Sequence, residues 1–117
     1  MFISLLAKIL DTAVLLNVAP DPADRQEILR EFIVETRSDM AGLERALSAD
    51  DFQASVRIAH CIKGACAMVG AVELAQICAT IERLGQSNAR QSPDGARAAF
   101  DRLTAYLDAE ERARGCP

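Results

Sequence analysis

Apolar side chains recur every three or four residues along most of this chain, which is the spacing of one face of an α-helix. The pattern predicts one long amphipathic helix from about residue 21 to residue 47, and another from residue 50 to residue 69. A third helix follows from about residue 72 to residue 84, and a fourth runs from about residue 93 to residue 113. Valine, isoleucine and threonine form no alternating runs, so strands have little support.

Residues at the predicted helix ends support these boundaries. Asp21-Pro22 and Ser92-Pro93 each place a capping side chain before a proline at the first helical position. Asp50, with Gln53 three residues later, has the pattern of a capping box. Gly70 suits the left-handed conformation that often ends a helix. Because only two residues separate the helix before residue 70 from the one after it, these helices should form an antiparallel hairpin.

The first 20 residues form an apolar addition to this pattern. Lys8 and Asp11 interrupt the apolar run, which argues against a membrane span, and no basic residue precedes it as in a signal peptide. Several apolar residues of this segment recur with the spacing of a helix: Phe2, Leu5, Leu6, Ile9, Ala13 and Leu16. We therefore expect one amphipathic helix, or two short ones, on the side of the domain.

The predicted fold is a single all-α domain spanning residues 1–117. Helices joined by short connections bury their apolar faces against one another, so residues 21–113 should form an antiparallel up-down four-helix bundle. Residues 1–20 would add an N-terminal helix. Half of the 117 residues are hydrophobic, which is enough for a core of one domain.

Charge and cysteine content narrow the possible partners and compartment. The formal net charge is −4 and the sequence pI is about 4.9, which disfavours nucleic acid as a partner. No feature predicts direct membrane contact. Four cysteines (Cys61, Cys66, Cys78 and Cys116) have spacings unlike a zinc site or a secreted disulfide framework. We read them as free thiols in a reducing compartment, which indicates the cytoplasm.

The candidate chemistry centres on His60, the only histidine of the chain. Lys63 and Gly64 follow three and four residues later, so all three share one side of the predicted helix. Glycine inside a helix is unfavourable by up to about 1 kcal/mol relative to alanine. Gly64 therefore suggests that space beside the imidazole is needed for a large partner.

A partly exposed imidazole beside a cation suits phosphoryl transfer. Neutral imidazole is a nucleophile near physiological pH, and the nitrogen that reaches solvent, Nε2, would take the phosphoryl group. Lys63 would offset the negative charge of that group. The other ring nitrogen could donate to a carboxylate, and the hairpin places residues 79–82 opposite His60. Glu82 is the polar candidate there, although a solvated position at the helix edge is its alternative role.

Other chemistry has less support. The chain has no Gly-rich phosphate loop and no G-x-S-x-G motif, so an enzyme of its own is not indicated. A metal site would have to combine His60 with scattered cysteines or glutamates, which the helix geometry disfavours. We expect no cofactor bound by the chain itself, and Mg²⁺ would come from the partner.

The segment Ala59-His60-x-x-Lys63-Gly64, followed by Gly70, resembles the signature of histidine-containing phosphotransfer (HPt) domains. The resemblance runs from about Asp11 to Glu111, with Ile62 and Cys66 as mild departures that concern packing. The flanking segments that also resemble the family are Ile28-Leu29-Arg30-Glu31-Phe32, Asp50-Asp51-Phe52 and Leu74-x-x-x-Cys78-x-x-Ile81-Glu82.

The resemblance implies a non-enzymatic phosphocarrier of a His-Asp phosphorelay. His60 would accept a phosphoryl group from an aspartate of a receiver domain and pass it to another receiver. Such domains occur as separate proteins and as modules of hybrid sensor histidine kinases, some of them membrane-anchored. Neighbours of His60 that would line the docking surface are Arg57, Cys61, Ala67 and Met68.

The sequence is also compatible with two other functions. The chain could be a degenerate bundle of this family that only docks partners or dimerises, although the presence of His60, Lys63 and Gly64 together argues against it. It could also be a redox-sensing or metal-sensing bundle that uses its cysteines.

Overall fold

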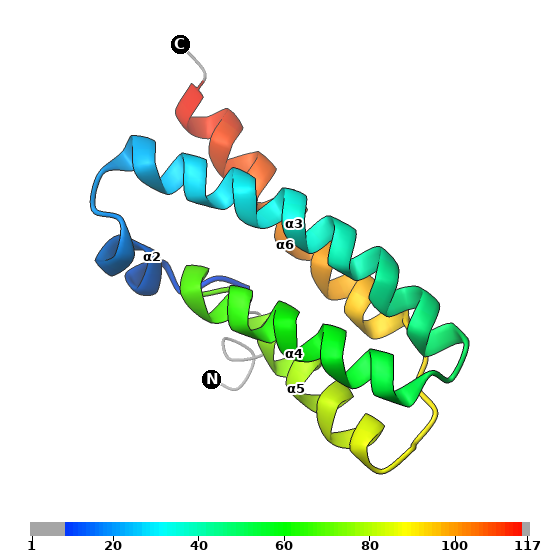
Figure 1. Cartoon of the computed structure of the whole chain (residues 1–117). Helices are drawn as coiled ribbons and strands as arrows, with labels where there is room; N and C mark the ends of the chain where they lie inside the picture. The colour runs from blue at the N-terminus through cyan, green and yellow to red at the C-terminus, as the bar shows by residue number, and fades with distance from the viewer. Residues whose placement is uncertain (1–8, 116–117) are drawn as a thin grey trace, which may run out of the picture.

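A computed structural model describes residues 9–115 as helices joined by short turns (Figure 1). No strand occurs among these residues, so the predicted all-α class is confirmed. The helices are α2 (Thr12–Val18), α3 (Pro22–Ser48), α4 (Phe52–Val69), α5 (Val72–Gln86) and α6 (Asp94–Gly115).

The four longer helices form the predicted up-down bundle. Each of α4, α5 and α6 runs back along the helix before it, and α3 also packs against α6, which closes the ring (Figure 1). The helix α2 contacts α4. Because α4 and α5 are joined by a tight turn, they lie side by side over most of their length, and this hairpin carries the candidate site.

The core consists of the apolar stripes that helical spacing predicts. In α4 the fully buried residues include Ala59, Ile62 and Cys66, which all point toward the other helices. The spacing did not single out Ser55, which is also buried. Its hydroxyl donates to the carbonyl of Asp51 at 2.9 Å, so this polar group is satisfied within its own helix.

The start of α4 differs from the prediction by one residue. Asp51 is the N-cap: its Oδ1 accepts from the backbone N–H of Ala54 at 3.1 Å. Asp50 instead has a φ of 54°, a left-handed conformation that reverses the chain after α3. The capping-box assignment of Asp50 and Gln53 was therefore wrong, because Gln53 is only the second helical residue after the true cap.

The turn between α4 and α5 depends on Gly70. Its φ is 80°, so the predicted left-handed cap is confirmed. The backbone N–H of Asp11 donates to its carbonyl at 2.7 Å, and a Cβ at this position would clash with the Asp11 carbonyl. Gly70 thus ends α4 and also receives the N-terminal segment.

The N-terminal addition contains one short helix, α2, within the described residues. The helix begins at Thr12, after the capping side chain of Asp11, and Ile9 and Leu10 are not helical. Phe2, Leu5 and Leu6, which share the predicted helical spacing, lie outside the described residues, as does Cys116. The alternative of a single continuous helix was therefore wrong, because residues 9–11 interrupt it, whereas α2 has the length expected of one of two short helices.

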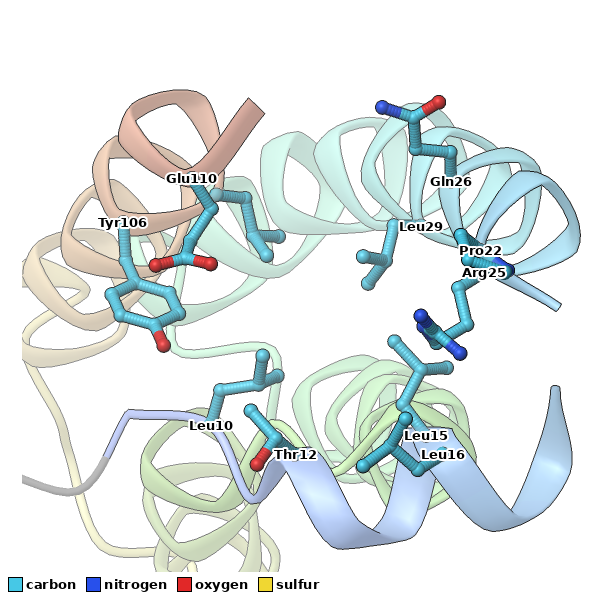
Figure 2. A pocket seen from close by; sticks show the side chains of 11 residues that line it. Leu10, Thr12, Leu15, Leu16, Pro22, Arg25, Gln26, Leu29, Tyr106 and Glu110 are labelled. Atoms are coloured by element: carbon cyan, nitrogen blue, oxygen red, sulfur yellow. The ribbon is translucent and has the colours of Figure 1, made fainter. Parts of the chain in front are cut away.

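An open pocket of about 200 Å³ lies where α2 meets the ends of α3 and α6 (Figure 2). Leu10 and Leu15 face Leu29 and Tyr106 across it, so its lining is mainly apolar. The guanidinium of Arg25 donates to the backbone carbonyls of Ala19 and Pro20, just after α2, at 3.0 and 2.6 Å. None of the lining residues belongs to the candidate site on α4.

Within the part of the chain that the structure describes, no helix has the length and apolar character required to cross a bilayer.

Candidate functional site

His60 projects from the middle of α4 into solvent. Its side chain is 69% exposed. Ala59 and Ile62 on either side of it in the sequence are fully buried, so helical periodicity turns the imidazole away from the core. A protein partner can therefore reach the ring without any rearrangement of the bundle.

Glu82 of α5 lies directly against the ring. Its Oε2 is 2.9 Å from Nδ1 of His60, and its side chain is only 13% exposed. The hairpin register, which placed residues 79–82 opposite His60, thus brings the candidate carboxylate to the imidazole. The alternative of a solvated residue at the helix edge does not describe this position.

Lys63 contacts the same carboxylate. Its Nζ is 2.5 Å from Oε1 of Glu82, so Glu82 bridges the imidazole and the ammonium group. The sequence pattern predicts Lys63 beside a future phosphoryl group but does not predict this ion pair. A signal was available, because residues three apart on a helix share a side, and the long lysine side chain reaches whatever faces that side.

These contacts determine the ionisation of Glu82. The contact with Lys63 is the largest cause that lowers its pKa; burial opposes this, and the hydrogen bond with His60 lowers it further. Glu82 is therefore a carboxylate at neutral pH, and a carboxylate only accepts hydrogen bonds.

The tautomer of the neutral His60 ring follows from this charge. Because Glu82 Oε2 can only accept, Nδ1 carries the proton. Nε2 is left with its lone pair on the exposed side of the imidazole. The arrangement presents a nucleophilic nitrogen to solvent and keeps a negative charge on the opposite side of the ring, where positive charge would develop during an attack.

The surface around His60 is open and lacks acidic residues on its own helix. A Cβ on Gly64 would meet no atom within 4 Å, so packing does not require glycine there. The four residues predicted to line a docking surface are all exposed: Arg57, Cys61, Ala67 and Met68. The helix α4 carries Arg57 and Lys63 but no aspartate or glutamate, whereas the whole chain has a net charge of −4.

The described cysteines are free thiols. Cys61 is exposed beside His60, whereas Cys66 and Cys78 are buried between α4 and α5. Burial raises the pKa of each buried thiol from 9.0 to about 12, so both are protonated at neutral pH. Protonated thiols are weak nucleophiles and weak metal ligands. Residues 9–115 contain no cluster of three or more potential ligands for a metal ion.

Comparison with known proteins places these features in a family. A family model described as Hpt domain matches residues 27–113, which include all of α4 and α5. The chain therefore belongs to the Hpt domain family, whose members are phosphocarriers of phosphorelays rather than kinases. The resemblance seen in the sequence is confirmed.

A solved structure agrees with this assignment. The fold matches the crystal structure of histidine-containing phosphotransfer protein B (HptB) from Pseudomonas aeruginosa PAO1 with a TM-score of 0.73 and 29% sequence identity. The match covers 92% of this chain and 97% of that protein. A search of curated proteins gave no significant match.

Proposed function

We propose that this protein is a phosphocarrier in a His-Asp phosphorelay, with His60 as the phosphoacceptor. A receiver domain would donate from its phosphorylated aspartate, and a second receiver would take the phosphoryl group from His60. The observation that carries this proposal is the exposed Nε2 of a ring whose Nδ1 is held by Glu82 at 2.9 Å. Family membership supplies the reaction class.

The transfer step needs no proton movement on the protein. The Nε2 lone pair attacks phosphorus, the bond between phosphorus and the aspartate oxygen breaks, and the aspartate leaves as a carboxylate. The ring keeps the proton on Nδ1 and becomes positively charged. Glu82 accepts from that N–H and stabilises the charge. Discharge reverses the step, because the electrons of the P–N bond return to Nε2 and leave a neutral imidazole.

The surroundings of His60 suit a partner that arrives with negative charge. An α4 surface with Arg57 and Lys63 and without acidic residues avoids repulsion of an aspartyl phosphate. Gly64 leaves room for the partner beside the ring. The chain would contribute neither a metal nor a nucleotide, and Mg²⁺ would be brought by the receiver. Arg57, Cys61, Ala67 and Met68 would lie in the contact area.

The same face would serve a separate protein or a module of a hybrid sensor histidine kinase. We place the activity in the cytoplasm, where free thiols such as Cys61 stay reduced.

A bundle that only docks partners or dimerises is the alternative. It would have no use for a carboxylate that orients the exposed imidazole, and Glu82 is held in that position. A redox or metal sensor is less well supported, because the buried thiols Cys66 and Cys78 are protonated at neutral pH.

Transfer from a phosphorylated receiver tests the proposal. The chain is incubated with a receiver phosphorylated on aspartate, in the presence of Mg²⁺, and the labelled residue is mapped by mass spectrometry at neutral pH. We expect acid-labile label on His60 and none on the His60→Gln variant. The variant should fold normally by circular dichroism, because the side chain is largely exposed. Label retained by the folded variant would place the acceptor elsewhere and contradict the proposal.

A further inference from the structure

Lys63 has a partner before any phosphoryl group arrives. Its Nζ lies 2.5 Å from Oε1 of Glu82, and Oε1 is shielded from solvent. The described residues offer this oxygen no hydrogen bond of standard geometry, so the nearby ammonium is what compensates its charge. A phosphoryl group on His60 would place about two negative charges one helical turn from the same ammonium. Two anions then compete for one cation.

We propose that Lys63 exchanges Glu82 for the phosphoryl group when His60 is phosphorylated, and that Glu82 thereby limits the lifetime of the phosphohistidine. This inference rests on the proposed function and concerns the control of the same site. Glu82 acts here as a positioning residue, because it touches Lys63 and the imidazole but not the phosphoryl group.

The exchange follows from the geometry of the two partners of Lys63. The lysine side chain is 38% exposed, so its end can swing toward solvent, whereas Glu82 is only 13% exposed and stays between the helices. Movement of the ammonium to the phosphoryl group would leave Oε1 of Glu82 buried without a counter-charge. The phosphorylated state is therefore less favourable than it would be if Lys63 had no other partner.

The second contact of Glu82 sets the protonation state of the ring. Its Oε2 accepts from Nδ1–H and favours the positively charged phosphorylated ring. In that form, rupture of the P–N bond releases a neutral imidazole, which is a good leaving group. Oε1 therefore makes the phosphorylated state less favourable, whereas Oε2 keeps the ring in the protonated form from which the phosphoryl group can pass to the next acceptor.

Lysine NMR tests the exchange in the wild-type protein. Lys8 and Lys63 are the only lysines of the chain, so ¹³Cε labelling gives two signals, assigned with Lys63→Arg. Phosphoramidate is the phosphoryl donor. Nε2 of His60 attacks its phosphorus, the P–N bond of phosphoramidate breaks, and ammonia leaves. We expect the Lys63 signal to shift on phosphorylation, and not to shift in His60→Gln treated in the same way.

The outcomes of this experiment are distinguishable. An unchanged Lys63 signal in fully phosphorylated protein would overturn the exchange and leave the proposed function intact. A histidine that accepts no phosphoryl group from either phosphoramidate or a receiver would overturn both.

A double-mutant cycle measures the competition. The lifetime of the phosphohistidine is followed in the wild-type chain, in Glu82→Gln, in Lys63→Met and in the double variant. Glutamine keeps an oxygen that can accept from Nδ1–H but removes the charge that holds Lys63. We expect Glu82→Gln to lengthen the lifetime and Lys63→Met to shorten it. In the Glu82→Gln background Lys63 is wholly available to the phosphoryl group. Lys63→Met should therefore shorten the lifetime there by a factor at least about three times greater than in the wild-type background.

Glu73→Gln is the matched control. Glu73 is another partly buried glutamate of α5, paired with Arg102 at 2.7 Å and away from His60. Its removal should leave the lifetime unchanged. Equal effects of Lys63→Met in the two Glu82 backgrounds would show independent action of the two residues and contradict the exchange.

Discussion

The behaviour of His60 depends on its two neighbours as much as on its own chemistry. An exposed imidazole without partners would populate both neutral tautomers, and either nitrogen could react. The carboxylate of Glu82, 2.9 Å from Nδ1, selects the tautomer with a free Nε2, and Lys63 keeps that carboxylate ionised. The cluster of His60, Lys63 and Glu82 thus selects the tautomer of the ring with one charged residue from α4 and one from α5.

Gly64 provides a test of the space beside the ring. A Cβ at this position meets nothing within 4 Å, and alanine favours helix over glycine. We therefore expect Gly64→Ala to raise the free energy of unfolding by up to about 1 kcal/mol, measured by urea denaturation. Gly64→Glu should slow phosphotransfer from a receiver by at least about tenfold, which corresponds to about 1.4 kcal/mol, because it adds bulk and negative charge at the docking face.

The control for Gly64 is the response to a small donor. Phosphoramidate should still label His60 in Gly64→Glu, because a small reagent does not need the cleared surface. Transfer from the receiver at the wild-type rate in Gly64→Glu would contradict the hypothesis that Gly64 leaves space for the partner beside the ring.

At the scale of the element, the start of α4 is set by two consecutive aspartates with different tasks. Asp51 caps the helix through the backbone N–H of Ala54, and Asp50 has the left-handed φ of 54° that turns the chain. Both have the residue type expected of a cap, so composition alone cannot distinguish them. The length of the turn after α3 decides which one caps, and that length is a property of the packed helices.

Paired substitutions test this assignment. Asp51→Ala removes the cap and should lower the free energy of unfolding by about 1 kcal/mol. Asp50→Gly keeps the left-handed conformation without its steric penalty and loses only the exposed ion pair with Arg90. It should therefore change stability by no more than about 0.5 kcal/mol. Denaturant unfolding of both variants gives the comparison, and a larger loss in Asp50→Gly would favour the other capping assignment.

Much of the hairpin could be predicted from the sequence, because it follows from local rules. Two residues between helices force an antiparallel pair, Gly70 marks the turn, and counting outward from it reaches Glu82 opposite His60. The ion pair of Lys63 with Glu82 was missed because the conformation of a long side chain depends on what stands across the helix interface. The start of α2 at Thr12 was missed for a related reason: Asp11 bonds to Gly70, a contact between distant segments.

At the scale of the whole molecule, the bundle separates its chemistry from its core. The buried thiols lie between α4 and α5, whereas the imidazole of His60 is exposed on the outer side of α4. The apolar pocket next to α2 is lined by other residues. Burial raises the pKa of Cys66 to about 12, with Cys78 as the second cause. Burial also raises the pKa of Cys78 to about 12; Glu82 adds to this shift and Lys63 opposes it.

Because of these thiols, the stability of the fold should depend on pH in the alkaline range. Their pKa values are higher in the folded than in the unfolded chain, where 9.0 is the ordinary value. Their contribution to stability is therefore complete below pH 9.0 and is lost as the pH rises toward about 12. The loss is at most about 1.4 kcal/mol per pH unit for each thiol. Urea denaturation under reducing conditions, repeated through this range, should show a steep fall in the free energy of unfolding.

Substitution separates the buried thiols from the other groups that titrate at high pH. Cys78→Ala loses packing and should be less stable at neutral pH. Its free energy of unfolding should fall less steeply above pH 9.0, because the variant lacks one thiol with a raised pKa. Cys61→Ala, which removes the exposed thiol, should keep the wild-type slope. Identical slopes for all three proteins would mean that the buried thiols do not control the alkaline limit.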